Sequence, residues 1–354
     1  MRLEKRSPRL ASLGMLLAGM MVVGAARADV TADSAGSLII YPKVVSDGSR
    51  DTLIQLSNTS NSAAFVHCFY VNTLGQCSLT DQSCRLDSDC PETELCVRTC
   101  EANNFDLILT AQQPTQWRAS TGRLVSITPP PCRPGQACEC SSGVGGQACP
   151  GLEIGANNQP FAPGVGTQFE GELKCYQLAS DFATPFAGNA LKGTATLETL
   201  ASGQISEYNA LAVAANPAID GSGLNSDGDL RLNYSGIGAG EYNYCPRNVV
   251  FTHHGEGGVN AATNATISTE VTLVPCTELI EEAEAVPVIV NFRGVNEFEQ
   301  PLSADGVNFD CYFSRRLEDI PSEGQGVFTA SNGQLWKTRV TPSTASICWT
   351  GSNR

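Results

Sequence analysis

Short apolar segments separated by polar turns recur along the chain after residue 28. Typical ones are 38–42 (LIIYP), 51–58 (DTLIQLSN), 67–71 (HCFYV) and 249–252 (VVFT), which are rich in β-branched and aromatic residues. Runs of this length bounded by Gly, Pro, Asn and Ser predict β-strands. An amphipathic helix of 12 or more residues is not expected, and only 278–284 has short helical character. Many short strands with turns between them predict an all-β protein.

Five features occur twice in the same order. They are an apolar run ending at Pro, a run ending at Asn, Cys followed by aromatics, Trp beside a basic residue, and Cys followed by an aromatic. The first copy has them at 38–42, 51–58, 67–71, 116–118 and 171–176, and the second at 271–275, 288–296, 310–313, 335–337 and 345–349. A conserved order of this kind predicts an internal repeat.

The repeat leads to a fold class. The order Cys, Trp, Cys resembles the general immunoglobulin-like pattern, although not an antibody domain in detail. We therefore expect two related immunoglobulin-like β-sandwich domains with disulfide-rich loop insertions. The expected boundaries are 29–185 for the first domain, with Cys-rich inserts at 76–101 and 128–166, 186–269 for a middle β segment that completes one or both sandwiches, and 270–354 for the second repeat.

The first 28 residues have the pattern of a secretory signal peptide. Arg2, Lys5, Arg6 and Arg9 precede an apolar run over 10–25, and Ala26-Arg27-Ala28 fits a cleavage site. The run is short for a membrane span of about 20 residues, which is the rival interpretation. No second apolar run of that length follows, so we expect no transmembrane segment in the mature chain. Export places it in the periplasm or outside the cell.

Charge narrows the range of partners. The chain has 22 Lys+Arg against 36 Asp+Glu, a formal net charge of −14, and only 16% of its residues are charged. Binding to nucleic acid requires clustered Lys and Arg, and anionic lipid surfaces attract basic segments. The composition therefore disfavours both partners and leaves an unknown protein or glycan.

All 15 cysteines follow the cleavage site, and export at this density predicts disulfides. Six are spread among strand-like segments, and the repeat predicts that they pair as Cys68–Cys175, Cys311–Cys348 and Cys245–Cys276. Nine are crowded in the inserts and are expected to pair among themselves with one left over, free or linking two chains: Cys77, Cys84, Cys90, Cys96, Cys100, Cys132, Cys138, Cys140 and Cys149. Zinc is the weaker alternative, since only Cys96 and Cys100 have a suitable spacing and no His is near.

Established catalytic spacings are missing from the sequence. We find no G-x-S-x-G, H-E-x-x-H, Walker loop or C-x-x-C. His67 reads as a strand residue. His253 and His254 are adjacent, so on a strand they point to opposite faces and do not readily share a metal, with or without Glu256.

Two sets of acidic and amide residues are spaced so that they could form a metal or catalytic site. Asn225, Asp227 and Asp229 alternate like the first ligands of a calcium loop, but Leu230 replaces the required Gly and no Glu follows at the twelfth position. They are a weak calcium candidate, the only cofactor expected. Glu170 and Glu172 share a strand face, where alternating carboxylates are ordinary on an exposed surface. A glycosidase pair is the other interpretation.

Segments 38–45, 51–58 and 169–175 resemble uncharacterised exported β-rich proteins of environmental bacteria. The resemblance covers most of the mature chain outside the Cys-rich inserts, and it implies export without implying a mechanism. The sequence thus predicts a secreted or periplasmic, non-enzymatic β-sandwich protein with a binding or structural role at the cell envelope. The alternatives are a carbohydrate-directed hydrolase and a disulfide-linked homo-oligomer.

Overall fold

The computed structural model describes residues 30–31, 34–84, 89–97, 100–123, 162–182, 184–215, 242, 248–260, 262, 264–276, 288–309, 311–320, 328–342 and 346–353. Side chains are not described at 30–31, 276, 305 and 346–353. These ranges contain strands and one 3-10 turn, and no α-helix. The all-β prediction is therefore confirmed. The expected signal peptide, most of the 128–166 insert and 278–284 lie outside the described residues.

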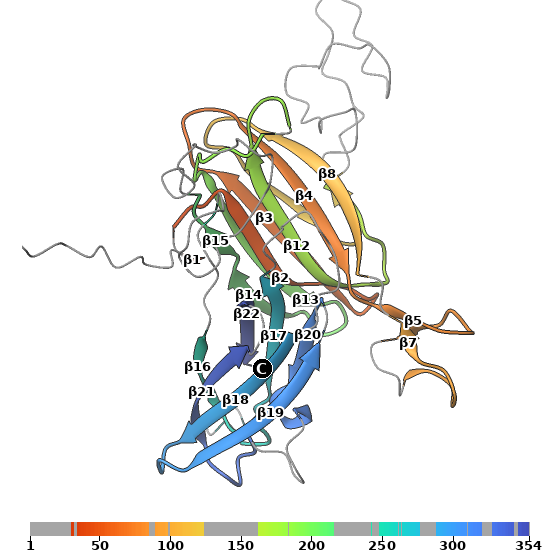
Figure 1. Cartoon of the computed structure of the whole chain (residues 1–354), viewed down its shortest axis with the longest axis vertical. Coiled ribbons are helices and arrows are strands. Elements are labelled where there is room, and N and C mark those ends of the chain that lie inside the picture. Colours follow the sequence, from red (N-terminus) through yellow and green to blue (C-terminus); the bar gives the residue numbers. More distant parts are fainter. Residues whose placement is uncertain are drawn as a thin grey trace, which may run out of the picture.

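Two six-stranded antiparallel sheets form what we call the N-terminal sheet pair (Figure 1). The first sheet has the order β1 (Val30–Thr31), β15 (Leu211–Val213), β2 (Leu38–Ser46), β12 (Phe169–Leu178), β4 (Ala64–Asn72) and β8 (Glu101–Leu109). The second has the order β11 (Ala162–Pro163), β10 (Gly122–Arg123), β9 (Pro114–Arg118), β3 (Arg50–Asn58), β13 (Leu191–Thr199) and β14 (Gln204–Asn209).

An apolar core lies between these two sheets. Alternate residues of each strand point inward, as the period of a strand requires; Ile54, Leu107 and Leu173 are completely buried there. Trp117 is also buried, and its indole N–H donates a 2.6 Å hydrogen bond to the Tyr70 hydroxyl. The apolar runs of the sequence thus form one continuous core, with the polar tip of its Trp satisfied inside it.

A second, smaller pair of sheets follows, the C-terminal sheet pair (Figure 1). One sheet has the order β16 (Val249–His254), β21 (Leu335–Pro342), β18 (Val288–Asn296) and β19 (Pro301–Phe309). The other has β20 (Phe313–Arg316), β17 (Thr269–Cys276) and β22 (Ser346–Asn353), with the 3-10 turn η3 (Leu317–Asp319) after β20. Phe292, Phe328 and Trp336 are fully buried between the sheets, and the Trp336 indole N–H donates to the Gly333 carbonyl at 3.0 Å.

A small three-stranded sheet projects from the side of the N-terminal sheet pair (Figure 1). It has the order β6 (Ser83–Cys84), β5 (Gly75–Cys77) and β7 (Cys96–Val97). We call residues 75–97 the cystine module. It lies in the chain between β4 and β8, which are hydrogen-bonded neighbours, so the insertion leaves their pairing intact.

A third apolar cluster joins the two sheet pairs. Ile40, Phe69 and Tyr176 point away from the N-terminal core and pack with Val274 and Tyr312 of the C-terminal sheet pair. The outer face of the β2–β12–β4 sheet is therefore covered rather than exposed to water. This packing makes β2 and β12 buried along their whole lengths.

The disulfide scheme is confirmed in one sheet pair and wrong in the other. Cys68 and Cys175 lie directly opposite each other on β4 and β12 and form a disulfide, with Cα atoms 4.1 Å apart. Cys311 bonds to Cys100, not to Cys348. The physical reason is strand order. β4 and β12 are neighbours, whereas β17 lies between β20, which follows Cys311, and β22, which carries Cys348.

The remaining cysteines divide by location. Within the cystine module, Cys77–Cys90 and Cys84–Cys96 are disulfides, as expected for the crowded group. Cys100 was expected to pair inside that group and does not. All eight cysteines whose side chains the structure describes are in intrachain disulfides, so none of these eight links two chains. The other seven, including the predicted Cys245–Cys276 pair, lie outside the described side chains.

Candidate functional site

A buried ionic contact lies where the two sheet pairs meet. Lys43 of β2 is 4% exposed, and its ammonium group forms an ion pair with Glu270 of β17. The same ammonium donates to the Ser314 hydroxyl at 3.1 Å, and that hydroxyl donates to Glu270 at 2.9 Å. Burial lowers the pKa of Lys43, and the neighbouring Glu270 carboxylate opposes that shift. A buried ion that loses its partner is strongly destabilising, so this contact ties the two sheet pairs together.

The two strand carboxylates considered as a catalytic pair lie beside this contact. We expected Glu170 and Glu172 on an exposed strand face, and this was wrong: they are 6% and 2% exposed. The reason is that the C-terminal sheet pair covers the outer face of β12. Glu170 accepts a 3.4 Å hydrogen bond from the Tyr312 hydroxyl and lies 3.7 Å from the guanidinium of Arg50.

Glu172 is held by a cation on its own strand. Its carboxylate lies 2.7 Å from the Lys174 ammonium, two residues further along β12. Burial raises the pKa of Glu172, and the ion pair with Lys174 opposes the rise. A carboxyl with a raised pKa is suited to general-acid catalysis only where substrate can reach it. Both carboxylates are enclosed by protein and face cations, which suits a structural contact.

A shallow cavity of about 180 Å³ opens elsewhere on the N-terminal sheet pair, beside β13 and β14. Its lining includes Glu198 and Arg50. Glu198 is held at 2.9 Å by the Arg118 guanidinium. The cavity therefore brings one ion-paired carboxylate to the surface, whereas glycoside hydrolysis uses two carboxyl groups.

The two adjacent histidines point in opposite directions at the end of β16, as strand geometry requires. His253 is 1% exposed, stacks on Trp336 with ring planes 7° apart, and shares a 2.9 Å hydrogen bond with the Thr338 hydroxyl. Burial lowers its pKa to about 4, so it is neutral at pH 7. His254 is exposed on the other face. His253 is part of the apolar core.

Glu256, the third member of that group, points elsewhere. One carboxylate oxygen accepts a hydrogen bond from the backbone N–H of Thr269, and burial raises its pKa. It thus fixes the start of β17 within the C-terminal sheet pair. The weak calcium candidate, Asn225, Asp227 and Asp229, lies outside the described residues.

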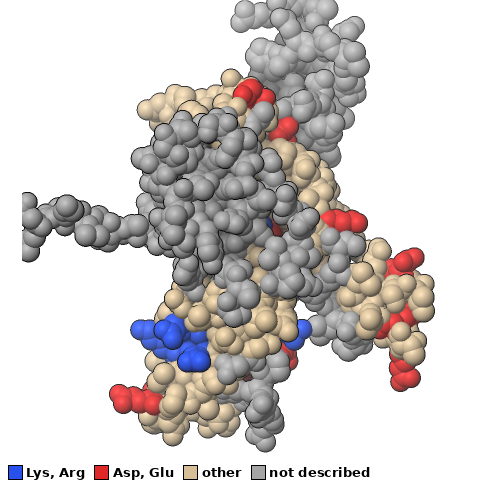
Figure 2. Space-filling view, viewed as in Figure 1, with Lys and Arg blue, Asp and Glu red and all other residues tan. Residues whose placement is uncertain are grey.

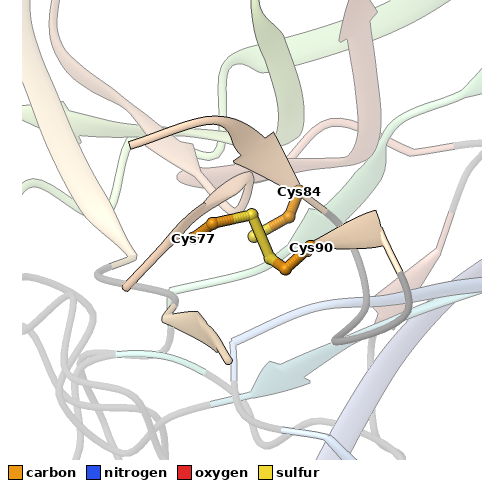
Figure 3. Close-up of side chains that lie close together, drawn as sticks. All are labelled: Cys77, Cys84 and Cys90. Atoms are coloured by element: carbon orange, nitrogen blue, oxygen red, sulfur yellow. A yellow bond between two sulfur atoms is a disulfide. The ribbon is translucent and has the colours of Figure 1, made fainter. Parts of the chain in front are cut away.

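Three sulfur atoms converge inside the cystine module (Figure 3). The sulfurs of Cys77, Cys84 and Cys90 all lie within 4.8 Å of one another. They belong to two adjacent disulfides, Cys77–Cys90 and Cys84–Cys96. Metals bind thiolates, and sulfur in a disulfide carries no such charge. The cluster in this oxidised form is therefore a structural staple.

The two disulfides replace an apolar core in the module. They pack on the backbone of Gly75, where an added Cβ would lie 2.6 Å from the Cys96 sulfur. The buried Glu94 carboxylate adds a polar clamp, because it accepts hydrogen bonds from the N–H groups of Leu79 and Thr80 and from the Thr80 hydroxyl at 2.9–3.2 Å. A segment too polar and short to bury a core is thus held rigid by covalent and polar contacts.

Apolar side chains cover the outside of this rigid module. Leu79, Leu95 and Val97 are 78%, 62% and 52% exposed. Leu95 and Val97 are two residues apart on an extended chain, so they share a face. The Ser78 N–H donates to the Leu95 carbonyl at 3.0 Å, so the backbone that carries Leu79 follows directly beside Leu95. Exposed apolar groups gathered on a projecting element mark interaction surfaces.

Sequence reasoning missed this surface. It found the insert from its cysteines, but Leu79, Leu95 and Val97 are isolated among polar residues and give no periodic signal. The Glu94 carboxylate holds the backbone of Leu79 in this module, although the two residues are 15 positions apart in the chain.

The comparisons with known proteins add no family. No protein-family model matches the chain, and no curated protein has a similar sequence. No helix in the described part of the chain is long and apolar enough to cross a membrane.

Proposed function

We propose that this chain is an exported, non-enzymatic protein with a binding role at the cell envelope, and that the cystine module makes the contact. The observation that carries the proposal is the rigid module with its three exposed apolar side chains. A rigid element loses little conformational entropy on binding, so exposed apolar area on it converts efficiently into affinity. Loops that carry function on a rigid β scaffold are common.

Export is supported by the signal-peptide pattern of residues 1–28 and by the cysteine chemistry. Four disulfides connect the described cysteines, and such bonds persist in oxidising compartments. These observations are compatible with the periplasm or the extracellular space.

Two related immunoglobulin-like sandwiches remain our proposal for the scaffold. The proposal is supported by two asparagines at matching places. The Asn58 side-chain amide, at the end of β3, donates to the Thr110 carbonyl at 2.9 Å, just before the Trp strand β9. The Asn296 amide, at the end of β18, donates to the Asn332 carbonyl at 2.6 Å, just before the Trp strand β21. In each sheet pair, a buried Asn at the end of one strand thus hydrogen-bonds to the turn that precedes the Trp strand.

A carbohydrate-directed hydrolase is the alternative function. It would need two carboxyl groups around an accessible glycosidic bond. The ion pairs and burial of Glu170 and Glu172 favour the structural interpretation. The binding role is therefore the better supported of the two.

The test is co-sedimentation of the purified, oxidised protein with washed envelopes of the producing cells. We compare wild type with Leu79→Arg/Leu95→Arg in the module and with the matched control Leu200→Arg/Ile205→Arg, whose parent side chains are 51% and 67% exposed on the N-terminal sheet pair. We expect the module variant to bind at least about tenfold more weakly, which corresponds to about 1.4 kcal/mol. The control should bind like wild type.

Two results would overturn the proposal. One is equal envelope binding by wild type and the module variant. The other is release of reducing sugar from a panel of polysaccharides that is abolished by Glu172→Gln while the variant stays folded by circular dichroism.

A further inference from the structure

Basic and apolar side chains share the outer face of the C-terminal four-stranded sheet. Arg293 on β18 lies directly opposite Arg339 on β21, and Val295 lies opposite Lys337. Val250 on β16 extends the first row, since it pairs with Arg339. All five side chains are exposed. We call these five residues the basic sheet face.

The positive charge of this face is not compensated within the described structure. Two like charges directly opposite each other on neighbouring strands are destabilising. None of the three basic residues, Arg293, Lys337 and Arg339, forms an ion pair with a residue that the structure describes. In a chain of net charge −14, such a face is suited to an acidic partner with apolar groups of its own.

The cystine module has that complementary chemistry. Residues 75–97 include five acidic residues and one basic residue. Asp81 and Glu92 are exposed on the module, as are Leu79, Leu95 and Val97. Val250 and Val295, at 49% and 43% exposure, provide apolar area on the opposing face. The cystine module and the basic sheet face therefore have opposite charge, and both expose apolar side chains.

The two parts face away from each other. Figure 2 shows Lys and Arg gathered on the left of the C-terminal sheet pair, whereas the module projects to the right with only acidic colour among its described charged residues. One molecule cannot bring its own module to its own basic sheet face. A second copy can.

We infer that the cystine module of one copy docks on the basic sheet face of the next, so that copies associate head to tail. The inference rests on the proposed binding role of the module and names its partner. Such a contact joins two different surfaces and leaves one of each free, so it propagates into open chains of copies unless a ring closes. Because both surfaces are small, we expect a dissociation constant on the order of micromolar.

The first experiment is analytical ultracentrifugation of the oxidised mature chain from about 1 to 100 µM, chosen to bracket that affinity. We expect reversible association beyond the dimer, weakened at least about tenfold when NaCl is raised from about 0.05 to 0.5 M, since salt screens exposed charges. Non-reducing electrophoresis should show a single-chain band, because the contact is not covalent.

The second experiment tests the head-to-tail geometry. The module variant Leu79→Arg/Leu95→Arg and the face variant Arg293→Glu/Arg339→Glu should each be monomeric alone. Each retains one intact surface, so an equimolar mixture should form a dimer and nothing larger. The control Leu200→Arg/Ile205→Arg should associate like wild type.

The outcomes separate this inference from the proposed function. Wild type that stays monomeric at the highest concentration, or a mixture that stays monomeric, overturns head-to-tail association. If the module variant still loses envelope binding in that case, the proposed function stands with a different partner. If envelope binding is also unchanged, both fall.

Discussion

The two sheet pairs share a linear order of features but use their cysteines differently. In the N-terminal pair the Cys strand and the closing strand are neighbours, and Cys68–Cys175 links them within one sheet. In the C-terminal pair β17 lies between β20, which follows Cys311, and β22, which carries Cys348, and Cys311 bonds to Cys100 beside the cystine module. One disulfide therefore holds a sheet together, and the other holds two parts of the molecule together. The position of a cysteine along the chain does not decide which.

The two sheet pairs also differ in the hydrogen-bond partners of their buried polar groups. Trp117 donates to another side chain, Tyr70, whereas Trp336 donates to the backbone of Gly333 and stacks on a neutral histidine. The C-terminal core thus contains a group that titrates, His253. This difference predicts that acid affects the C-terminal pair first.

The largest expected effect comes from the disulfide that links the two parts. Cys100→Ala/Cys311→Ala removes a link that spans 211 residues, which in the chain-entropy model costs about 5 kcal/mol of unfolding free energy. We expect the C-terminal core to exchange its amide hydrogens faster while the N-terminal core is little changed. Hydrogen exchange of each core in mild denaturant measures this.

The matched comparator is Cys68→Ala/Cys175→Ala, which opens a 107-residue loop and should cost about 4–5 kcal/mol, felt in the N-terminal core. If both variants speed up hydrogen exchange in the same core to the same extent, the two disulfides do not stabilise different cores.

The next effect concerns the ionic contact between the sheet pairs. Lys43→Met leaves the Glu270 carboxylate without its cation, and we expect a loss of about 3 kcal/mol in denaturant unfolding. Adding Glu270→Gln removes the uncompensated charge, so the double variant should recover most of the loss. Equal stability of the single and double variants would show that the ion pair does not couple the two sheet pairs.

A smaller effect is pH dependence through His253. Its pKa is about 4 in the folded protein, below the ordinary value of about 6.5. The unfolded chain therefore binds more protons between these values, and stability falls as pH drops through that window. His253→Gln should remove about 3 kcal/mol of the change between pH 7 and 4. His254→Gln, on the exposed face of the same strand, should follow wild type, and an equal effect of both would contradict the core role of His253.

The smallest effect on global stability is expected in the cystine module. Cys84→Ser/Cys96→Ser removes one of its two staples, but the module contributes nothing to the two apolar cores. We expect global unfolding to shift by less than about 0.5 kcal/mol, while proteolytic cleavage within 75–97 becomes much faster. Global destabilisation comparable to that of the Cys68→Ala/Cys175→Ala variant would show that the module is part of the scaffold.

Local pattern was enough to predict the strands. The apolar runs at 38–42, 51–58, 67–71 and 288–296 all lie in strands, because alternation and β-branched residues report on a pleated, half-buried surface. The Cys68–Cys175 bond also followed from the sequence, as did disulfide formation within the crowded group, but the partners Cys77–Cys90 and Cys84–Cys96 did not. The opposite orientation of His253 and His254 needed only the period of a strand.

Burial of the charged strand face could not be predicted that way. Glu170, Glu172 and Lys174 alternate like residues exposed to water, and only the C-terminal sheet pair packed on β12 makes them internal. The same holds for the exposed apolar side chains of the module, which lie on one projecting element because Glu94 and the disulfides hold its turns together.

The sequence by itself determined the all-β class, the positions of the main strands and the Cys68–Cys175 disulfide between directly paired strands. Tertiary structure alone decided the strand order, and with it the partner of Cys311, the burial of Glu170 and the two faces that point away from each other. The physical reason is the difference in sequence distance over which the two properties are decided. Strand formation depends on side-chain alternation over a few residues, whereas strand neighbours are chosen by packing among segments hundreds of residues apart.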